Sequence, residues 1–354
     1  MSESPLSTLP TTQKRWIWPG AVNGVDGLEF VDDEVPQPNA GEVLVRIHAV
    51  SLNFRDLLVA RGVYGKTMGS GLTPGCDPAG EVVALGPGDN IKIKIGDRVT
   101  VPFFPTDKGG GLSPSILDTT LGASSQGTLM EYKIFDAEWL IRIPDSLTYE
   151  EAATFSCAGL TAYNAILGGL RPILPGETVL IQGTGGVSIF GAQIARASGA
   201  RVILTSSSDE KLAQIQKFVD ETINYKTYPE WHERVLSLTD GRGADLILDV
   251  GGNDTLGSSL HALAMGGSIS IIGGIGGFES HIRLWEVIYK SANVRGITVG
   301  TRKQLESLLH LFNLRSIKPV VGKIFQLSEL KEALKTLERQ DFIGKVVVKV
   351  AAST

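Results

Sequence analysis

Apolar and polar positions follow two different patterns along the chain, and the pattern changes near Glu150. Between Trp16 and about Ile143, short apolar runs are broken by Gly and Pro, and helical spacing occurs only over Arg55–Arg61. This pattern predicts a compact β-rich domain. Its candidate strands lie at Val43–Ala49, Glu81–Leu85, Arg98–Phe103 and Met130–Phe135. The stretch Pro105–Gln126 is rich in Gly, Ser and Pro, which predicts a surface loop.

After Glu150 the pattern predicts alternating helices and strands, beginning with a helix over Ala152–Leu167. Candidate strands lie at Val179, Val202, Thr222, Leu246, Ile269 and Val294. Such a series is typical of a doubly wound parallel sheet, an α/β fold. The segment Gln304–Lys349 shows two helices around a strand near Val320, then a β-rich run that we assign to the first domain. We therefore expect one domain over 1–152 and 303–354, and a second over 153–302.

A glycine turn at residues 183–186 follows the apolar run Thr178–Gln182 and precedes helical spacing over Val187–Ala197. A strand, a glycine turn and a helix, followed by a second buried strand, form the phosphate-binding unit of dinucleotide folds. Side chains at the turn would keep the backbone from the pyrophosphate, and the start of the helix offers unpaired N–H groups. The third glycine of the usual GxGxxG pattern is Ser188 here, which is still small enough for close packing of helix on strand. A glycine-rich turn in another kind of α/β protein is the alternative.

The second buried strand ends in Ser206, Ser207 and Ser208, and Lys211 lies one turn into the next helix. Folds that bind NAD carry an Asp or Glu near this point to hold the ribose 2′-OH. Hydroxyl donors and a cation suit a 2′-phosphate instead, whereas a carboxylate would repel it. The sequence therefore predicts NADP as the cofactor. The serines also suit capping of the following helix, and the two roles are compatible.

Composition narrows the class of partner. The chain has 354 residues, of which 42% are hydrophobic and 20% charged, and this suits a globular protein of two domains. A net charge of −5 argues against nucleic acid or an anionic membrane as a partner. Residues 1–16 lack the apolar core of a signal peptide and are expected to form a loose tail. No apolar run is long enough to span a bilayer, and two cysteines give no disulfide framework. We expect a soluble, cytoplasmic protein with a small-molecule substrate.

A series of landmarks in a fixed order resembles the medium-chain dehydrogenase/reductase superfamily across essentially the whole chain. They are HAVSLNFRD (48–56), PGCDPAGEVVALG (74–86), IGDRV (95–99), EEAATFSCAGLTAYNA (150–165), QGTGGVS (182–188), TSSSDEK (205–211), INY (223–225), RGADLILDVGG (242–252), VRGITVG (294–300) and GKVVVKV (344–350). The resemblance is greatest to the zinc-independent, quinone-oxidoreductase-like branch, whose members are often named zinc-type alcohol dehydrogenase-like. It implies a GroES-like, β-barrel-type catalytic domain, a Rossmann domain, an active site in the cleft between them and a homodimer.

The resemblance also bears on metal binding. Zinc-dependent relatives carry a Cys where this chain has Asn53, a His where it has Cys76 and a Cys where it has Cys157. Asp77 stands near the place of a Glu that can approach the metal. Catalytic zinc needs three good N, S or O ligands, and an amide is a poor one, so we expect no bound metal. The alternative is a zinc alcohol dehydrogenase that uses Cys76, Cys157 and Asp77. The cysteines also suit a role as small buried hydrophobes. His48 lies in a strand pattern and suits a core or edge position.

Without zinc, the resemblance implies hydride transfer from NADPH to a quinone or to a C=C bond conjugated to a carbonyl. It implies three catalytic residues. Asn53 would be an amide donor on the nicotinamide side, and Tyr64 would donate a proton to an enolate. Asp56 would lie near the cleft. Tyr64 also suits a role as a loop aromatic that only lines the pocket, and Asp56 could orient neighbours or cap a helix.

The resemblance supplies further cofactor contacts. It places Thr161 near the nicotinamide, Tyr225 beside the adenosine phosphate, Ile272 and Val299 at strand ends against the ring, and Lys345 in the cleft. Ile272 and Val299 also suit the core. The expected cofactor-binding set is Asn53, Thr161, Gly183, Gly185, Gly186, Val187, Ser206, Ser207, Ser208, Lys211, Tyr225, Ile272, Val299 and Lys345. The alternative from another functional class is a non-catalytic protein that binds NADPH.

Overall fold

The computed structural model describes residues 9–65, 67–88, 91–107, 113–277, 279 and 282–350. The chain divides into two compact units. Unit 1 is Met1–Cys157 with Thr301–Thr354, and unit 2 is Ala158–Gly300. The boundaries thus fall at 157/158 and 300/301, where the sequence pattern had suggested 152/153 and 302/303. No helix among the described residues is long and apolar enough to cross a membrane.

Unit 2 is built on a six-stranded sheet in which every neighbouring pair of strands is parallel. In spatial order the strands are β10 (Glu221–Asn224), β9 (Arg201–Ser206), β8 (Thr178–Gln182), β11 (Ala244–Asp249), β12 (Leu263–Ile271) and β13 (Asn293–Gly296). Numbered by their place in the unit, the order is 3-2-1-4-5-6, that of the doubly wound dinucleotide fold. The predicted fold class and all six predicted strands are confirmed.

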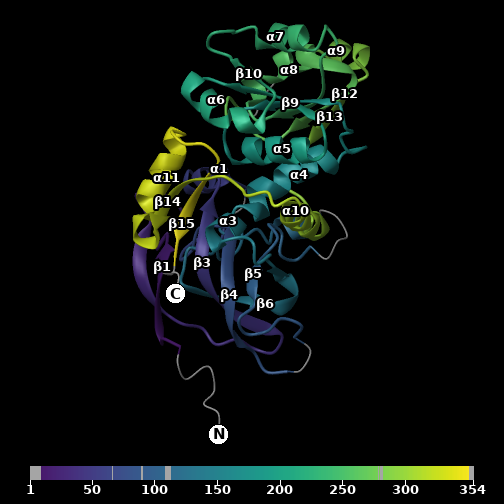
Figure 1. Cartoon of the computed structure of the whole chain (residues 1–354). Coiled ribbons are helices and arrows are strands. Elements are labelled where there is room, and N and C mark those ends of the chain that lie inside the picture. The colour runs from purple at the N-terminus through teal and green to yellow at the C-terminus, as the bar shows by residue number, and fades with distance from the viewer. Residues whose placement is uncertain are drawn as a thin grey trace. The chain divides into compact units, whose positions relative to one another are not determined.

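Helices cover this sheet (Figure 1). They are α4 (Leu160–Leu167), α5 (Gly186–Ala197), α6 (Asp209–Ile215), α7 (Trp231–Leu238), α8 (Leu256–Ala262) and α9 (Leu284–Tyr289). Central strand β8 is buried along its whole length and reads as one apolar run, because helices cover a parallel sheet on both faces. Trp231 and Val235 of α7 pack with Leu260 of α8 in one core cluster that also contains Ile247 of β11.

The helix predicted over Ala152–Leu167 is interrupted. The structure has α3 (Tyr149–Ala152), then a π-helical turn over Phe155–Gly159, then α4. Side chains in this stretch bond to backbone groups, which competes with a regular helical ladder. The Thr154 hydroxyl donates to the carbonyl of Glu151 at 2.6 Å, and that of Ser156 to the carbonyl of Val101 at 2.6 Å. The irregular turn carries Cys157, the last residue of the first segment of unit 1.

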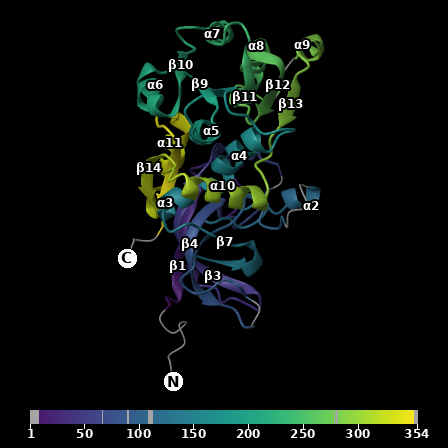
Figure 2. The same ribbon diagram turned by 45° about the vertical axis from the view of Figure 1, so that its right-hand side comes forward.

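Unit 1 contains a mixed sheet and a small hairpin (Figure 2). The sheet runs in the order β14 (Val321–Gln326), β15 (Lys345–Lys349), β3 (Glu42–Leu52), β4 (Asp77–Leu85), β5 (Arg98–Thr100) and β7 (Ile141–Arg142), and β6 (Tyr132–Asp136) pairs with β3. The hairpin joins β1 (Thr12–Ile17) to β2 (Glu29–Glu34). The helices are α1 (Phe54–Ala60), α2 (Pro114–Leu117), α3, α10 (Arg302–Leu314) and α11 (Leu330–Arg339). Both views show α11 beside β14.

Two expectations for unit 1 need correction. The predicted tail over residues 1–16 is wrong for its last part, since Thr12–Ile17 is a paired strand and the Trp16 indole donates to the carbonyl of Leu327 at 2.7 Å. Residues 1–8 of that tail, and 108–112 of the predicted loop Pro105–Gln126, lie outside the described residues. The loop is not a surface feature throughout. Its segment 120–123 is buried, and Gly122 within it packs closely against the backbone of Gly75.

Candidate functional site

Three neighbouring strands of unit 1 bring residues that are distant in the sequence together at one end of the strands. Strand β3 is antiparallel to β15 on one side and to β4 on the other. The end of β3 therefore lies beside the start of both neighbours. Asn53 follows β3 directly, Asp77 is the first residue of β4, and Lys345 is the first residue of β15. Antiparallel pairing thus assembles a cluster that no local sequence pattern could show.

Hydrogen bonds fix the orientation of the Asn53 side chain in this cluster. Its Nδ2 donates to Asp77 Oδ2 at 2.8 Å, and its Oδ1 accepts a hydrogen bond from the Lys345 ammonium. Lys345 also donates to the carbonyl of Leu52 at 2.6 Å. All three side chains of the cluster are buried. A cation on the amide oxygen and a carboxylate on the amide nitrogen allow only this orientation.

Each oxygen of the Asp77 carboxylate accepts a hydrogen bond. The thiol of Cys76 donates to Asp77 Oδ1 at 3.3 Å, while Oδ2 accepts the amide of Asn53. Burial raises the pKa of Asp77 to about 6, and the charge of Lys345 and the hydrogen bonds from Asn53 and Cys76 oppose that rise. Both carboxylate oxygens are therefore occupied by donors from within unit 1.

The donor set does not fit a catalytic zinc ion. Within the described part of the chain, no group of three or more His, Cys, Asp and Glu side chains is arranged to hold a metal. An ammonium group bonds to the amide of Asn53, and a cation is the group that a metal ion would repel. Cys76 is buried and Cys157 is half-buried. The two cysteines lie close enough to interact through their thiols.

The other residues expected to be catalytic lie next to this cluster. Asp56 accepts the backbone N–H of Asn53 at 2.7 Å, so its carboxylate caps the start of α1. Tyr64 follows α1, and its ring lies over the guanidinium of Arg55, 4.6 Å from ring centre to Cζ. Burial raises the pKa of Tyr64, while the charge of Arg55 lowers it, and the rise prevails. Arg55 was missed by the sequence analysis, because its neighbours Asn53 and Asp56 are polar too and nothing in this window shows that its side chain is buried.

In unit 2, the glycine turn has the predicted form. Gly183 has a φ of +77°, a backbone conformation that side chains disfavour. Gly185 precedes α5, and a Cβ there would meet no atom within 4 Å, so the turn leaves open the space that a phosphate group needs. Ser188 is buried, and its hydroxyl donates to the carbonyl of Gln182 at 2.7 Å. Helix α5 packs tightly on the sheet at Gly191, where a Cβ would lie 2.8 Å from Leu248.

A buried network that the sequence analysis missed holds the ends of β8 and β11 together. The Gln182 amide donates to Asp249 at 3.0 Å, and its oxygen accepts the backbone N–H of Val250 at 3.1 Å. Asp249 also accepts from the hydroxyls of Thr255 at 2.7 Å and Ser259 at 2.6 Å. Gln182 and Asp249 also accept the backbone N–H groups of Gly251 and Gly252, so the network holds the glycine-rich loop that follows β11. In folds of this class such loops face the ligand.

The end of β9 carries the serines expected at the ribose. Ser206 is buried, and Ser207 and Ser208 are half-buried. Ser208 caps α6, because its hydroxyl accepts the backbone N–H of Lys211 at 3.2 Å. The backbone N–H of Tyr225 donates to the carbonyl of Ser206 at 3.0 Å, which brings Tyr225 to the same end of the sheet. The structure thus gathers Ser206, Ser207, Ser208, Lys211 and Tyr225 at one place.

Three further expected residues lie elsewhere in unit 2. Thr161 is buried one turn before Asn164 on α4, and the Asn164 amide donates to the carbonyl of Val299 at 2.7 Å. Val299 has a φ of +51°, which is strained for a β-branched residue. The backbone N–H of Ile272 donates to the carbonyl of Asp249 at 2.8 Å, just beyond β12.

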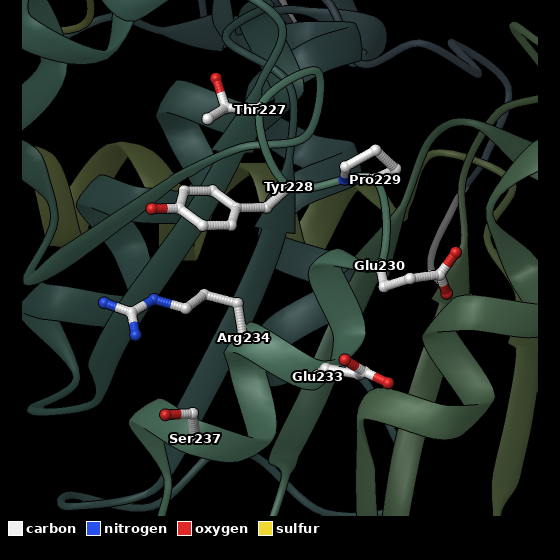
Figure 3. A pocket seen from close by; sticks show the side chains of 7 residues that line it. All are labelled: Thr227, Tyr228, Pro229, Glu230, Glu233, Arg234 and Ser237. Carbon is white, nitrogen blue, oxygen red and sulfur yellow. The ribbon is translucent and has the colours of Figure 1, made fainter.

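A surface hollow of about 370 Å³ lies elsewhere on unit 2, at the start of α7 (Figure 3). Its lining residues are Thr227, Tyr228, Pro229, Glu230, Glu233, Arg234 and Ser237. None of the residues expected to bind the cofactor lines it. Charges of both signs on one helix face are typical of a solvated surface, and we assign no ligand to this hollow.

Two family models match the chain. The alcohol dehydrogenase GroES-like domain matches residues 39–145, and the zinc-binding dehydrogenase family matches residues 186–313. The zinc-type alcohol dehydrogenase-like protein of Schizosaccharomyces pombe is 38% identical over 343 residues, which cover 95% of this chain and 99% of that protein. The chain belongs to the medium-chain dehydrogenase/reductase superfamily. Its resemblance to the quinone-oxidoreductase-like branch is confirmed, and it is an oxidoreductase of this superfamily.

Other members of the superfamily differ in what they act on. The acryloyl-coenzyme A reductase of Sulfurisphaera tokodaii is 30% identical and covers 95% of this chain and 99% of its own length. The quinone oxidoreductase of Pseudomonas aeruginosa is 31% identical, with 93% and 97% covered. A crystal structure of an NAD-dependent alcohol dehydrogenase has a TM-score of 0.87 at 33% identity, covering 96% of this chain and all of that one. A mycobacterial protein complexed with NADPH has a TM-score of 0.78 at 26% identity, with 95% and 99% covered.

Proposed function

We propose that this protein is an NADPH-dependent reductase without a catalytic zinc ion, and that it reduces a quinone or a C=C bond conjugated to a carbonyl. The observation that carries the proposal is the internal pairing of Asn53, Asp77 and Lys345. These side chains form hydrogen bonds with one another in the region where zinc-dependent relatives carry their metal ligands. Activated acceptors need no metal, because their own electron-poor carbon accepts the hydride. Relatives that act on acryloyl-coenzyme A and on quinones support this choice.

The residues of unit 2 fit the cofactor. The open turn at Gly183, Gly185, Gly186 and Val187 would hold the pyrophosphate, and the serines with Lys211 and Tyr225 would hold the 2′-phosphate. Thr161, Ile272 and Val299 would flank the nicotinamide. When bound, NADPH supplies the hydride.

The residues of unit 1 would hold the acceptor. Tyr64, whose pKa is raised by burial, keeps its proton at neutral pH and is the proposed proton donor. Asn53 and Lys345 would form a fixed polar surface beside the nicotinamide, because both side chains already donate hydrogen bonds to groups of unit 1. Asp56 holds the start of α1 in place.

Purified, untagged protein tests the proposal. We expect oxidation of NADPH that depends on an added quinone or enone, and far less than one zinc per chain by elemental mass spectrometry after purification without chelators. About one zinc per chain, with NADP⁺-dependent oxidation of alcohols, would instead place Cys76, Cys157 and Asp77 around a metal. Tight NADPH binding without turnover on any acceptor would favour a non-catalytic binding protein.

We also propose that two copies of the chain associate through the β13 edge of unit 2. Strand β13 pairs only with β12, so its other edge has no strand partner among the described residues. Helix α9 lies in the same region and exposes Leu284, Trp285, Ile288 and Tyr289, with Trp285 70% exposed. Large exposed apolar side chains gathered on one helix mark interaction surfaces. Light scattering on a size-exclusion column should give a dimer for the natural protein and a monomer for Trp285→Lys.

A further inference from the structure

The guanidinium group of Arg55 is buried but only partly hydrogen-bonded. The side chain is 7% exposed. Its Nη1 donates to the carbonyl of Leu121 at 3.1 Å and lies 3.4 Å from Asp56 Oδ1. Its Nε and Nη2 have no hydrogen-bond partner within the described structure. A buried cation with unpaired N–H groups is costly, because those groups have lost their water.

Aromatic rings do not provide what these N–H groups lack. The guanidinium centre lies 4.6 Å from the Tyr64 ring centre and 5.1 Å from that of Phe103. Such contacts attract a cation, but they offer no in-plane acceptor to the N–H groups along its edge. The nearest carboxylate, Asp56, already accepts the backbone N–H of Asn53 through its other oxygen. The Arg55 guanidinium therefore keeps a positive charge and N–H groups that lack an oxygen acceptor.

The surroundings of Arg55 place this charge at the proposed reaction site. Arg55 is two residues from Asn53, and its guanidinium interacts electrostatically with Cys76, Tyr64 and Cys157. Tyr64 and Cys157 are only half-buried, whereas Nε and Nη2 of Arg55 are themselves buried. A substrate oxygen would therefore reach these N–H groups by displacing the half-buried ring of Tyr64, which lies over the guanidinium.

We propose that Arg55 is the residue that binds the carbonyl oxygen of the acceptor, through the N–H groups of Nε and Nη2. Two parallel N–H donors suit one oxygen or a flat carboxyl-like group. This inference rests on the proposed function and assigns recognition of the acceptor's carbonyl oxygen to one residue. It also predicts poor reduction of acceptors that lack an oxygen at the end of the conjugated system.

The reaction balances around this contact. When bound, NADPH would supply the hydride that forms a C–H bond at the β-carbon. The π electrons of the C=C bond would then form a C=C bond to the carbonyl carbon, and the carbonyl π pair would move onto oxygen. The resulting enolate oxygen would accept hydrogen bonds from the N–H groups of Arg55. The α-carbon then takes a proton, from Tyr64 or from water, and the C=O bond forms again. The products are the saturated carbonyl compound and NADP⁺.

Steady-state kinetics with NADPH and the enone 3-penten-2-one test this role. Arg55→Met should lower kcat/KM by about 100-fold, the loss seen when one preorganised donor to an oxyanion is removed, and should leave the Kd for NADPH unchanged. The matched control is Arg61→Met, on the residue that ends α1, whose exposed guanidinium pairs with Glu338 at 2.6 Å. It should stay within about twofold of the natural enzyme. An unchanged kcat/KM in Arg55→Met, with the natural enzyme active, would overturn the inference and leave the proposed function standing.

A second variant and a binding probe guard against misfolding and against a wrong substrate class. Arg55→Lys keeps the charge but loses the paired donors, so it should fold and still lose about tenfold in kcat/KM. The probe is 4-nitrophenol, which changes colour on ionisation, added to the full chain without cofactor. The natural protein should favour the bound phenolate and lower the apparent pKa of the probe, and Arg55→Lys should lower it less. If the natural protein produced no such shift, the inference would fail even if no acceptor were ever found.

Discussion

The ammonium group of Lys345 donates a hydrogen bond to the side-chain oxygen of Asn53, a residue 292 positions earlier in the chain. The contact is buried, and it joins the start of β15 to the end of β3. It turns the amide nitrogen of Asn53 toward Asp77, so one cation sets the orientation of the whole cluster.

Removing that cation should destabilise unit 1. Lys345→Met would leave Asn53 Oδ1 and the carbonyl of Leu52 without a buried donor and Asp77 without its counter-charge. We expect a loss of about 2 to 4 kcal/mol in the free energy of unfolding, measured in urea. Lys323→Met on neighbouring β14, whose exposed ammonium pairs with Asp341 at 2.9 Å, should leave the urea midpoint close to that of the natural protein. Equal effects of the two changes would contradict the role given to the Asn53 contact.

Replacement of Tyr64 tests its place in the proposed reaction. Tyr64→Phe keeps the ring over Arg55 but removes the hydroxyl. Turnover of an enone should fall at least about tenfold while NADPH affinity stays unchanged. Tyr228→Phe, in the hollow at the start of α7, is the control and should have no effect. Full turnover in Tyr64→Phe would remove this hydroxyl from the mechanism.

A carboxylate at the end of β9 should reverse the proposed preference for NADPH. Ser207→Asp would place a negative charge where the 2′-phosphate is expected, so the Kd for NADPH should rise about 10-fold to 100-fold while that for NADH changes little. Fluorescence titration with each cofactor measures both constants. Ser237→Asp adds the same charge on the exposed face of α7 and serves as the control. Equal weakening of both cofactors would argue against a phosphate site at Ser207.

Stability should fall in mild acid because of His48. This side chain is 5% exposed, stacks on Tyr149 with ring centres 4.0 Å apart, and makes no hydrogen bond with the described residues. Burial, together with the charges of Arg46, Arg98 and Lys349, lowers the pKa of His48 to about 4, against the opposing charge of Glu150. The unfolded chain then takes up a proton more readily than the folded one, so this contribution is fully present above pH 6.5 and is lost as the pH falls toward 4.

A variant isolates that contribution. Urea unfolding between pH 7 and pH 4 should show a shallower decline of stability for His48→Gln than for the natural protein, measured relative to each variant's own value at pH 7. The control is His310→Gln, on the exposed surface of α10, which should keep the natural slope. If His48→Gln also kept the natural slope, another group would be responsible for the acid sensitivity.

The tight packing of α5 on the sheet at Gly191 should leave no room for a larger side chain. Gly191→Val would push into Leu248, whose methyl group lies 2.8 Å from the position of a Cβ. We expect a loss of about 1 to 3 kcal/mol in the free energy of unfolding. Gly257→Val in α8, where a Cβ would meet no atom within 4 Å, should change it by less than about 0.5 kcal/mol. A similar loss at both positions would contradict the packing explanation, because helix propensity favours Val over Gly in both helices.

Local patterns were enough to predict most of the fold. The central strands β8, β9 and β11 of unit 2 each contain a continuous apolar run. The turn before α5 requires a positive φ at Gly183, and the glycine itself shows this requirement in the sequence. Prediction failed where tertiary contacts override local pattern. The turn at Phe155–Gly159 depends on the bond from Ser156 to Val101, and the burial of Leu121 depends on packing against distant residues.

In the candidate site, too, local features were predictable from the sequence and tertiary contacts were not. Ser208 as a helix cap was predicted, because a cap and its partner lie three residues apart. The pairings of Asn53 with Asp77 and Lys345 could not be derived from the residues, because they arise from strand register across the sheet. Resemblance to a family placed Lys345 and Asn53 in one region, but it gave no sign that they bond to each other. Gln182 and Arg55 were missed because nothing in a short window distinguishes a buried polar residue from an exposed one.

The position of β15 in the middle of the unit 1 sheet also sets an order of events during synthesis. Unit 2 is one continuous segment and can fold as soon as the ribosome has released it. Unit 1 cannot close its sheet until β15, which lies beyond all of unit 2 in the chain, inserts between β14 and β3. Until then the end of β3 lacks its neighbour and Asn53 lacks its cation. A nascent chain can therefore carry a folded unit 2 well before unit 1 is complete, so the cluster of Asn53, Asp77 and Lys345 is among the last features to form.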